Sequence, residues 1–511
     1  MLARVLSSAV IGIDGCLVEV EVDIIQGLPA FTIVGLPETT VKESKERVKS
    51  AIGNSGYPFP ADRITVNLAP ADIKKEGTAF DLPIALGILA ATGIFARERL
   101  SAHLCMGELS LDGRVKPVHG TLPMALAARA AGYSGVFVPA ENAREVAFVE
   151  GIEAYPVKNL SQLVEFLRGR VELLPARTDG KKLFDSNGGY PVDFSEVMGQ
   201  EHVKRALEVA AAGGHNLLMV GPPGAGKTML ARRLPTVLPS ISFEEAIETT
   251  KVFSVAGLVD RRQPLITARP FRNPHHTISD AGLIGGGHIP RPGEVSLAHN
   301  GVLFLDELLE FKKHVLEALR QPLEDQSVTI SRAASTITYP ASFMLVGAMN
   351  PCPCGYYADS KHECRCSWPQ IQRYRSKISG PLMDRIDIHV EVPAVPYKDL
   401  AAESPNESSG KIKARVHAAR RVQANRFKRS RIHANAQMKN RHVRQHCRID
   451  SAAHALLETA IDRLGLSARA HNRILKISRT IADLDTRREI EVEHVSEAVQ
   501  YRTLDRGQAI A

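Results

Sequence analysis

Residues 216–228 read NLLMVGPPGAGKT, and this stretch decides the fold. The apolar run 216–220 is typical of a short buried strand, and the residues after it match the pattern G-x-x-x-x-G-K-[ST] at the start of a helix. Glycines let backbone N–H groups curl around phosphates, and the helix N-terminus adds a favourable dipole. A phosphate-binding loop for ATP is therefore predicted. Its residues would be Gly221, Pro222, Pro223, Gly224, Ala225, Gly226, Lys227 and Thr228.

Two residues of this loop have individual roles in the prediction. Lys227 would reach the β and γ phosphates, and Thr228 would ligate Mg²⁺. The alternative is a glycine-rich turn that matches the pattern by chance. All four fixed positions are present, with a strand before them and a helix after them, which makes that alternative rare.

Two further strands would bring polar groups to the same site. Residues 301–308 read GVLFLDEL, so Asp306 would hold Mg²⁺ and Glu307 would polarise the attacking water. Residues 343–349 form another apolar run that ends at Asn350, a position suited to a sensor of the γ-phosphate. Surface acids after a strand, and an Asn that opens a turn before Pro351, are the simpler alternatives. The upstream loop favours the catalytic interpretation.

Composition bounds the class of protein. The chain of 511 residues is too long for one hydrophobic core, and two or three domains are expected. The net charge of +8 permits a polyanionic partner without requiring one. No run of 18 apolar residues and no secretory cleavage pattern is present, and seven cysteines suit a reducing compartment. A cytoplasmic protein that does not bind membranes is expected.

The pattern of strands, helices and breakers predicts five segments. Residues 1–170 mix strands (17–25, 63–68, 135–139) with helices (from about 39, 82–89, 122–131, 160–167) and would form an α+β domain. Residues 171–192 are a predicted linker, and 193–395 alternate strand and helix as an α/β core. Residues 396–410 are a second predicted linker, and 411–511 are predicted to be all-helical.

Long stretches of the chain resemble one family. They are VMGQEHVKRALEVAAAGGHNLLMVGPPGAGKT (197–228), RPFRNPHHTISDAGLIGGGHIPRPGEVSLAHNGVLFLDEL (269–308), AMNPCPCGYY (348–357) and CRCSWPQIQRYRSKISGPLMDRIDIHVEV (364–392). The chain is similar over essentially its full length to the YifB/ComM family of magnesium-chelatase-like AAA+ ATPases. That resemblance implies a P-loop AAA+ core with a C-terminal helical lid. It also implies a homo-hexameric DNA helicase or translocase that promotes branch migration during natural transformation.

The resemblance also implies roles for arginines. In AAA+ rings an arginine from the neighbouring subunit contacts the γ-phosphate, and Arg385 matches that position. An ion pair with Asp384 or Asp387 is the alternative for Arg385. Arg469 matches the sensor of the helical lid, with Arg473 as a competitor.

The N-terminal part resembles another fold. Residues 64–140 are similar to the Lon-type protease fold of the ribosomal S5 domain 2-like class. Ala79 stands where that family has its nucleophilic serine, and residues 121–130 contain no lysine for the dyad. Without an activated nucleophile, a binding or assembly domain is expected rather than a protease.

Basic loops are the candidates for contacting DNA. Residues 285–293 match the family's helix-2 insertion, and residues 328–339 are predicted to form a β-hairpin with Arg332 near its tip. In a hexamer both loops would face the pore, where Arg291, Arg332 and His288 could hold phosphates of single-stranded or branched DNA without reading sequence. Ordinary solvated loops are the alternative. Residues 411–448 contain no Asp or Glu and many Lys and Arg, which favours a polyanion, although part of this segment could instead pack against acidic surfaces.

Four cysteines are clustered in the sequence. Cys352, Cys354, Cys364 and Cys366 could hold a structural Zn²⁺, with His362 as an alternative ligand. Reduced free thiols are the other possibility, because CxC spacing is less specific than CxxC. Cys16, Cys105 and Cys447 are expected to be isolated thiols.

Two rival functions fit the same ATPase motifs. A protein-remodelling ATPase would be expected to carry an aromatic pore loop, which neither candidate loop supplies. A chelatase motor subunit would need a porphyrin-handling partner, on which the sequence is silent.

Overall fold

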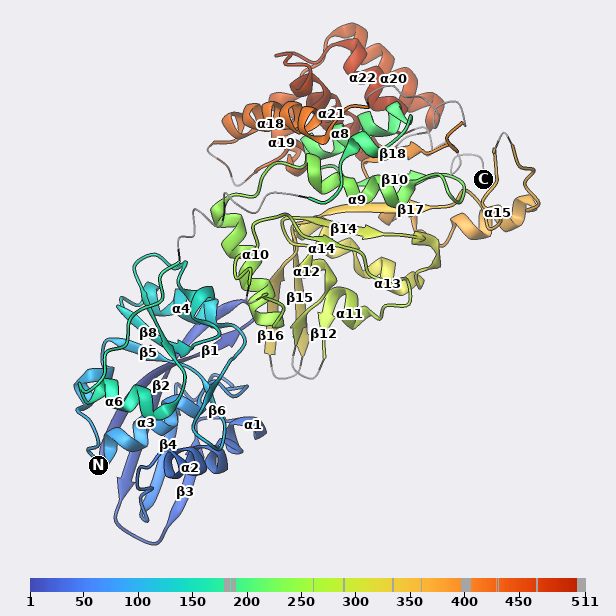
Figure 1. Cartoon of the computed structure of the whole chain (residues 1–511). Coiled ribbons are helices and arrows are strands. Elements are labelled where there is room, and N and C mark those ends of the chain that lie inside the picture. Colours follow the sequence, from blue (N-terminus) through green and yellow to red (C-terminus); the bar gives the residue numbers. More distant parts are fainter. Residues whose placement is uncertain are drawn as a thin grey trace. The chain divides into compact units, whose positions relative to one another are not determined.

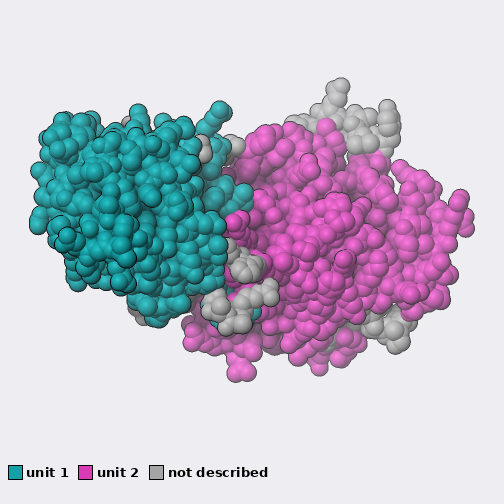
Figure 2. Space-filling model, turned by 90° about the horizontal axis from the view of Figure 1, so that it is seen from below, with its two compact units in different colours: residues 1–188, 243–267, 331–339 teal, residues 189–242, 268–330, 340–511 magenta. Residues whose placement is uncertain are grey.

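The chain folds into two compact units (Figures 1 and 2). The computed structural model describes residues 1–178, 184, 190–260, 262–287, 290–332, 335–359, 361–396, 406–428, 430, 432–465 and 467–502. Unit 1 comprises residues 1–188, 243–267 and 331–339, and unit 2 comprises residues 189–242, 268–330 and 340–511. Two segments from the predicted α/β core therefore pack with the N-terminal residues. The domain boundaries derived from the sequence stay a prediction, and parts of both predicted linkers lie outside the described residues.

Unit 1 is built on a seven-stranded mixed sheet, in the order β3-β4-β2-β1-β5-β8-β9. Its strands are β1 (Leu2–Ile11), β2 (Asp14–Ile25), β3 (Ala30–Val34), β4 (Arg63–Ala69), β5 (His103–Cys105), β8 (Gly135–Pro139) and β9 (Glu153–Val157). Partly exposed and buried residues alternate along β2, as the period-two pattern predicted, because one face of the sheet is covered by helices. β8 is buried at every residue, as expected for its continuous apolar run.

The helices of unit 1 confirm the helical segments predicted there. They are α1 (Thr39–Lys42), α2 (Ser44–Asn54), α3 (Asp81–Ala91), η1 (Arg97–Leu100), α4 (Thr121–Ala130), α5 (Ala143–Val146), α6 (Leu160–Leu167) and α10 (Phe243–Ala256), beside the short hairpin β6 (Glu108–Leu109) and β7 (Val115–Lys116). Helix α3 is buried along its whole length, since its eleven residues are almost all apolar. Helix α10 joins this unit through Lys251, which pairs with Asp14 at 2.6 Å, and through Ser254, whose carbonyl accepts the N–H of Gly120.

Unit 2 contains a five-stranded parallel sheet, in the order β11-β14-β17-β10-β18. The strands are β11 (Phe271–Arg272), β14 (Val302–Leu305), β17 (Met344–Met349), β10 (Leu217–Val220) and β18 (Ile388–Glu391). Every residue of β10, β14 and β17 is buried, which is typical of a parallel sheet covered on both faces. These strands confirm the apolar runs from which the core was predicted.

Helices and short hairpins are interspersed with these strands and follow them in the sequence (Figure 1). Before β18 they are η2 (Phe194–Glu196), α8 (Glu201–Gly213), α9 (Lys227–Val237), α11 (Asp280–Ile284), β12 (Gly285–Gly286), β13 (Arg291–Pro292), α12 (Glu294–Leu297), η3 (Leu308–Glu310), α13 (Lys313–Ala318), α14 (Arg320–Asp325), β15 (Ser327–Arg332), β16 (Ser335–Pro340), α15 (Trp368–Arg375) and α16 (Gly380–Met383). After β18 they are α18 (Ser409–Arg426), η4 (Asn435–Gln437), α19 (Asn440–His446), α20 (Ser451–Leu464), α21 (Ala468–Leu484) and α22 (Val492–Gln500). The C-terminal region is helical, as predicted. None of the helices in the described part of the chain is both long and apolar enough to cross a membrane.

A buried ion-pair network holds the C-terminal helices together. Asp483 of α21 is 1% exposed and accepts hydrogen bonds from both terminal nitrogens of Arg426 at 2.7 and 2.5 Å, from Arg479 Nε at 3.1 Å and from Asn435 Nδ2 at 2.9 Å. Removing one member of such a network leaves the opposite charge buried without its partner.

We therefore expect Asp483→Ala to lower the free energy of unfolding of this region by about 3–5 kcal/mol. Urea unfolding of the full chain, followed by circular dichroism, would measure the shift. Asp462→Asn, at an exposed position of α20, is the matched control and should leave the unfolding curve in place. Equal curves for the two variants would contradict this account of the network.

Candidate nucleotide site

Three strands of the unit 2 sheet deliver their following residues to one edge. β10 pairs with β17 (Leu217 with Val346), and β17 pairs with β14 (Gly347 with Leu305), all in parallel. The carboxyl ends of parallel strands meet at the same edge, so the loop after β10, the acids after β14 and Asn350 after β17 lie together. The structure thus brings together the residues that the three sequence runs predicted.

Lys227 is fixed inside the loop that follows β10. Its Nζ donates to the carbonyl oxygens of Gly221 at 2.7 Å and Pro222 at 2.9 Å, and to Asn350 Oδ1 at 3.1 Å. Burial lowers the pKa of Lys227, and the charges of two nearby carboxylates oppose that shift. Gly224 and Gly226 have φ of +76° and +86°, a conformation that glycine adopts without a steric penalty, and α9 begins at Lys227. The loop can therefore present backbone N–H groups and one ammonium to phosphates.

The two predicted oxygen ligands for Mg²⁺ lie side by side. The hydroxyl of Thr228 donates to Asp306 Oδ2 at 2.6 Å, and Asp306 Oδ1 accepts the backbone N–H of Glu307 at 3.0 Å. Hydroxyl and carboxylate oxygens are the donors that Mg²⁺ prefers, and this cation keeps several waters besides. These residues fit Mg²⁺, and the neighbouring lysine and loop fit the phosphates of ATP.

Glu307, the predicted water-positioning carboxylate, is exposed. Its side chain is 61% exposed, and its backbone is in the left-handed region at φ +51°, which is uncommon for a residue with a Cβ. His276 Nδ1 lies 3.5 Å from Glu307 Oε2. Sequence reasoning gave His276 no role, although the pair His275-His276 lies within one of the quoted stretches.

Arg385 is paired differently from the alternative considered in the sequence. It is 8% exposed, its terminal nitrogens contact Glu324 and the carbonyl of Pro381 at 2.5 Å, and neither Asp384 nor Asp387 is its partner among the described residues. Its buried Nε has no hydrogen-bond partner in the described part of the chain. Asp387 is occupied by other groups. Burial favours its neutral form, but the charge of Arg473 outweighs this and holds the pKa of Asp387 well below its usual range.

The two candidate lid arginines have different surroundings. Arg469 is 63% exposed at the start of α21 and lies 3.9 Å from Asp384. Arg473, one turn later, is 20% exposed and its guanidinium pairs with Asp387. Arg469 is therefore the more exposed of the two, while Arg473 joins the helical region to Asp387, directly before β18. The sensor role of Arg469 stays a prediction.

The candidate DNA loops are only partly described. Arg291 is exposed at the start of β13, whereas His288 and the side chain of Arg332 lie outside the described residues. The predicted hairpin is present as β15 and β16, but its outer residues 331–339 belong to unit 1. Ile337 packs there against Gly12, with its Cγ2 3.1 Å from the position of a Cβ on residue 12. The outer part of the hairpin is thus in contact with the N-terminal residues.

Several arginines of the acid-free segment 411–448 are paired with groups of the same fold. Arg415 pairs with Glu208 and Glu407, Arg420 donates to the carbonyl of Ala211 at 3.2 Å, and Arg426 belongs to the Asp483 network. Among the described residues of this segment, the exposed basic ones are Lys411, Arg421, Lys428, Lys439, Arg441, Arg444 and Arg448. The field predicted for this segment is therefore weaker than its sequence indicates.

The four clustered cysteines do form a cluster in space. Their sulfurs all lie within 4.8 Å of one another, with Cys352 Sγ 3.3 Å from Cys354 Sγ and 3.7 Å from Cys364 Sγ. Tetrahedral zinc, with Zn–S bonds of about 2.3 Å, places its sulfurs about 3.8 Å apart, so this geometry fits a Cys₄ metal site. His362 is outside the cluster, since its side chain is 61% exposed and lies beside Asp359.

The surroundings of the clustered sulfurs shift the pKa values of Cys354 and Cys364 in opposite directions. A hydrogen bond from the backbone of Tyr356 lowers the pKa of Cys354 to about 6. The backbone N–H of Cys366 favours the thiolate of Cys364, but desolvation and the neighbouring sulfurs outweigh it and raise the pKa of Cys364 to about 12. A divalent cation removes this repulsion between sulfurs. Cys16, Cys105 and Cys447 are isolated free thiols, as predicted.

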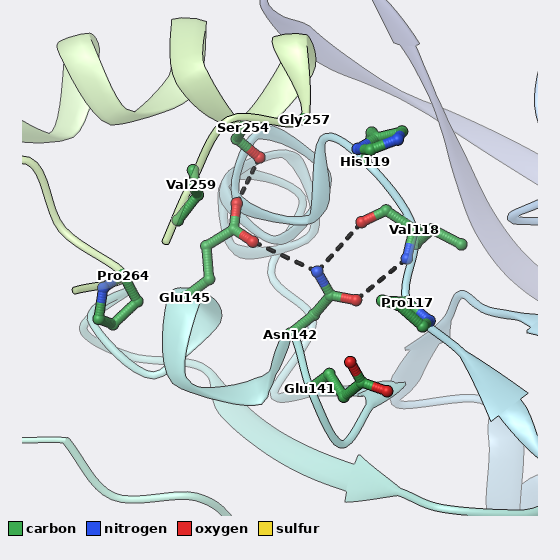
Figure 3. Close-up of a pocket in the computed structure, with 10 residues that line it drawn as sticks. All are labelled: Pro117, Val118, His119, Glu141, Asn142, Glu145, Ser254, Gly257, Val259 and Pro264. Atoms are coloured by element: carbon green, nitrogen blue, oxygen red, sulfur yellow. Dashed lines mark hydrogen bonds between the residues drawn. The ribbon is translucent and has the colours of Figure 1, made fainter. Parts of the chain in front are cut away.

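A small cavity in unit 1 is lined by polar groups that are hydrogen-bonded to other groups of the protein. It measures about 140 Å³, and Glu145, Asn142 and Ser254 are among its lining residues (Figure 3). Glu145 accepts hydrogen bonds from Ser254 Oγ and, at 2.7 Å, from Thr121 Oγ1, while Asn142 is bonded to the backbone of Val118. This carboxylate links Ser254 of α10 to Thr121 of α4, and we assign the cavity a structural role.

The region matched to the protease motif carries no nucleophile. Ala79 is buried at 5% exposure, and the neighbouring Thr78 donates to Glu108 at 2.5 Å. Lys75 is fully buried, and its ammonium contacts the carbonyl of Pro70. The residues from 121 to 130 form α4 and contain no lysine.

Comparison with known proteins places the chain among magnesium-chelatase-like proteins. Three family models match: "Subunit ChlI of Mg-chelatase" over residues 20–142, "Magnesium chelatase, subunit ChlI" over 193–400 and "Magnesium chelatase, subunit ChlI C-terminal" over 406–502. The magnesium-chelatase 38 kDa subunit of Cereibacter sphaeroides is 25% identical over 177 residues, which cover 32% of this chain and 53% of that subunit.

Two relatives match along nearly the whole length. Competence protein ComM of Haemophilus influenzae is 45% identical over 510 residues, covering 99% of this chain and 98% of that protein. The protein YifB of Salmonella typhimurium is 45% identical over 507 residues with the same coverage. The family matches and the parallel α/β sheet together fit an AAA+ core. This chain belongs to the YifB/ComM family of magnesium-chelatase-like AAA+ proteins.

Proposed function

We propose that this protein is an ATP-driven DNA motor, a homo-hexameric helicase or translocase that promotes branch migration during natural transformation. The observation that carries the proposal is the convergence of Lys227, Thr228, Asp306 and Glu307 at one sheet edge, which supports ATP hydrolysis. The relative named as a competence protein supports a role in handling incoming DNA.

The residues divide the work of hydrolysis among them. Lys227 neutralises charge on the β and γ phosphates. Thr228 and Asp306 would hold Mg²⁺, which would supply further neutralisation. Glu307 accepts a hydrogen bond from the attacking water and orients it, and His276 beside it limits where the carboxylate can point. Asn350, which accepts a hydrogen bond from Lys227, would sense the γ-phosphate.

Contact with DNA is proposed to be non-specific. Arg291 and the exposed basic residues of the C-terminal helices would neutralise phosphates, which gives an affinity that falls steeply with salt. The proposal that Arg332 contacts DNA is supported only by the presence of the hairpin formed by β15 and β16. The N-terminal domain, with Ala79 at the position of the nucleophile, is proposed to be a Lon-like binding or assembly domain without protease activity.

We expect single-stranded or branched DNA to raise the ATPase rate, and Glu307→Gln to lower the rate by about a hundredfold or more while ATP still binds. Steady-state phosphate release, with and without each DNA, would measure both effects. Glu310→Gln, at an exposed position three residues later, is the matched control and should keep the wild-type rate.

The same assay separates the rival functions. A rate that no DNA changes would contradict the DNA motor. Stimulation by an unfolded polypeptide instead would replace it with a protein-remodelling ATPase. The chelatase family matches make stimulation by a porphyrin-handling partner the remaining outcome to test.

A further inference from the structure

The four-cysteine cluster adjoins the phosphate-binding loop. Cys352 follows Asn350 by two residues, and Gly355 lies against Pro223 of the loop. A Cβ on residue 355 would lie 2.5 Å from Cδ and 2.8 Å from Cγ of Pro223, so the two backbones can approach this closely because residue 355 is glycine. Gly355 also has φ of +88°. The turn that carries two of the cysteines therefore packs on the ring of a loop residue.

The other two cysteines lead into a helix that returns to the same turn. Ser367, directly after Cys366, caps α15 through a capping box with Gln370. At the far end of α15, Arg375 Nε donates to the carbonyl of Pro351 at 3.1 Å, and its guanidinium lies 5.2 Å from the ring centre of Tyr357. One end of α15 thus follows Cys366 directly, and the other end contacts Pro351, which lies between Asn350 and Cys352.

The segment 351–367 has contacts of its own besides the sulfurs, among them the rings of Tyr356 and His362 side by side and the N–H of His362 donated to Asp359. Its described residues contain no helix and no strand. A short segment without secondary structure is held in one conformation by cross-links, and a metal with four thiolates supplies them. The backbone N–H of Tyr357 donates to Cys352 Sγ at 3.3 Å, and that of Cys354 to Cys366 Sγ at 3.4 Å, which adds the outer hydrogen bonds usual around such sulfurs.

We propose that the four cysteines bind Zn²⁺ and that this metal holds Gly355 against Pro223 and Asn350 beside Lys227, in the geometry that binds ATP. The inference rests on the proposed ATP site and adds a metal that positions it. Asn350 is covalently joined to the metal-held turn and is bonded to Lys227 at 3.1 Å, while Pro223 precedes Lys227 by four residues. Loss of the metal releases both supports of the loop together.

Metal content and nucleotide affinity test the inference directly. We expect protein purified without chelators to contain about one zinc per chain by mass spectrometry of the elements. After zinc is removed, the chelator dialysed away and Mg²⁺ restored, affinity for a fluorescent ATP analogue should fall at least about tenfold and recover with added ZnCl₂. Iron in place of zinc, or no metal, would overturn the zinc assignment. Zinc whose removal leaves nucleotide affinity unchanged would overturn the positioning role.

Variants distinguish the effect of losing zinc from the effect of disturbing the contact between Gly355 and Pro223. Cys364→Ser with Cys366→Ser should lose both zinc and nucleotide affinity, and Cys16→Ser, a half-exposed thiol elsewhere, should lose neither. Gly355→Ala should keep zinc but weaken nucleotide binding, because its methyl group meets Pro223. Gly132 has a similar φ of +84°, and a Cβ at that position would have no atom within 4 Å. Gly132→Ala therefore introduces the same backbone strain without the steric contact and is the control for strain. Full nucleotide affinity in Gly355→Ala would contradict the inference.

Failure of the inference is distinct from failure of the proposed function. If zinc-loaded wild-type protein binds no nucleotide, the ATP site itself is wrong. If it binds nucleotide equally well with and without zinc, the ATP site stands and only the positioning role fails. Neither measurement of nucleotide binding requires DNA.

Discussion

Lys227→Ala is expected to weaken ATP binding by at least about a hundredfold and to abolish turnover, since hydrogen bonds to a charged group each contribute about 1.5–3 kcal/mol. Nζ of Lys227 is held by two loop carbonyls and Asn350, so it is already at the place where phosphates enter. Alanine removes the one ammonium among these groups and leaves the carbonyl dipoles facing the phosphates. Titration with a fluorescent ATP analogue would measure the loss.

The control for this change is another buried lysine of unit 2. Lys204 of α8 is 5% exposed and pairs with Glu201 at 2.8 Å, so Lys204→Ala removes a similar charge from another pair. It should leave ATP affinity within a small factor of wild type. Lys227→Arg is expected to fail as well, because a guanidinium is larger than the point charge this loop holds. Wild-type affinity in Lys227→Ala would remove the basis of the ATP site.

Much of this site could be predicted from the sequence because its parts are local. Each of the three runs, around residues 220, 305 and 349, is an apolar strand followed at once by its polar group. Since parallel strands end at a common edge, three local patterns and one rule of topology were enough to bring Lys227, Asp306 and Asn350 together. The cysteine cluster could be predicted from the sequence for the same reason, because all four cysteines lie within fifteen residues.

The contacts that sequence reasoning missed join residues far apart in the chain. Arg385 contacts Glu324, His276 lies beside Glu307, and Gly355 packs on Pro223. Each depends on how two loops pack, and no periodicity in the sequence encodes that. The charge of segment 411–448 was overestimated for a related reason, since a count of basic residues does not reveal which of them face acidic partners such as Glu208.

The hairpin at 327–340 has one feature that the sequence predicted and one long-range contact that it did not. Alternating β-branched residues predicted its two strands correctly. Its outer residues pack on Gly12, more than three hundred positions earlier, which the pattern could not indicate. A pore-facing role for this hairpin therefore requires that the contact with Gly12 opens or that the N-terminal residues contribute to the same surface.

Arg385→Ala is expected to leave ATP binding intact and to lower turnover roughly a thousandfold, the order of effect attributed to an arginine that stabilises the transition state from a neighbouring subunit. In this structure the guanidinium pairs with Glu324 and keeps one buried N–H without a partner among the described residues. In the proposed ring that group would exchange Glu324 for the γ-phosphate of the next subunit. Arg320→Ala, on a half-exposed arginine paired with Glu317, is the matched control and should keep turnover.

Mixing two inactive variants tests whether the site is shared. Arg385→Ala subunits keep an intact phosphate-binding loop, and Lys227→Ala subunits keep an intact Arg385. In rings assembled from equal amounts of both, about a quarter of the interfaces combine the two intact halves. Turnover should therefore reappear in the mixture although neither variant has it alone. If Arg385 serves only its own subunit, for example by holding Glu324, no interface is complete and the mixture stays inactive.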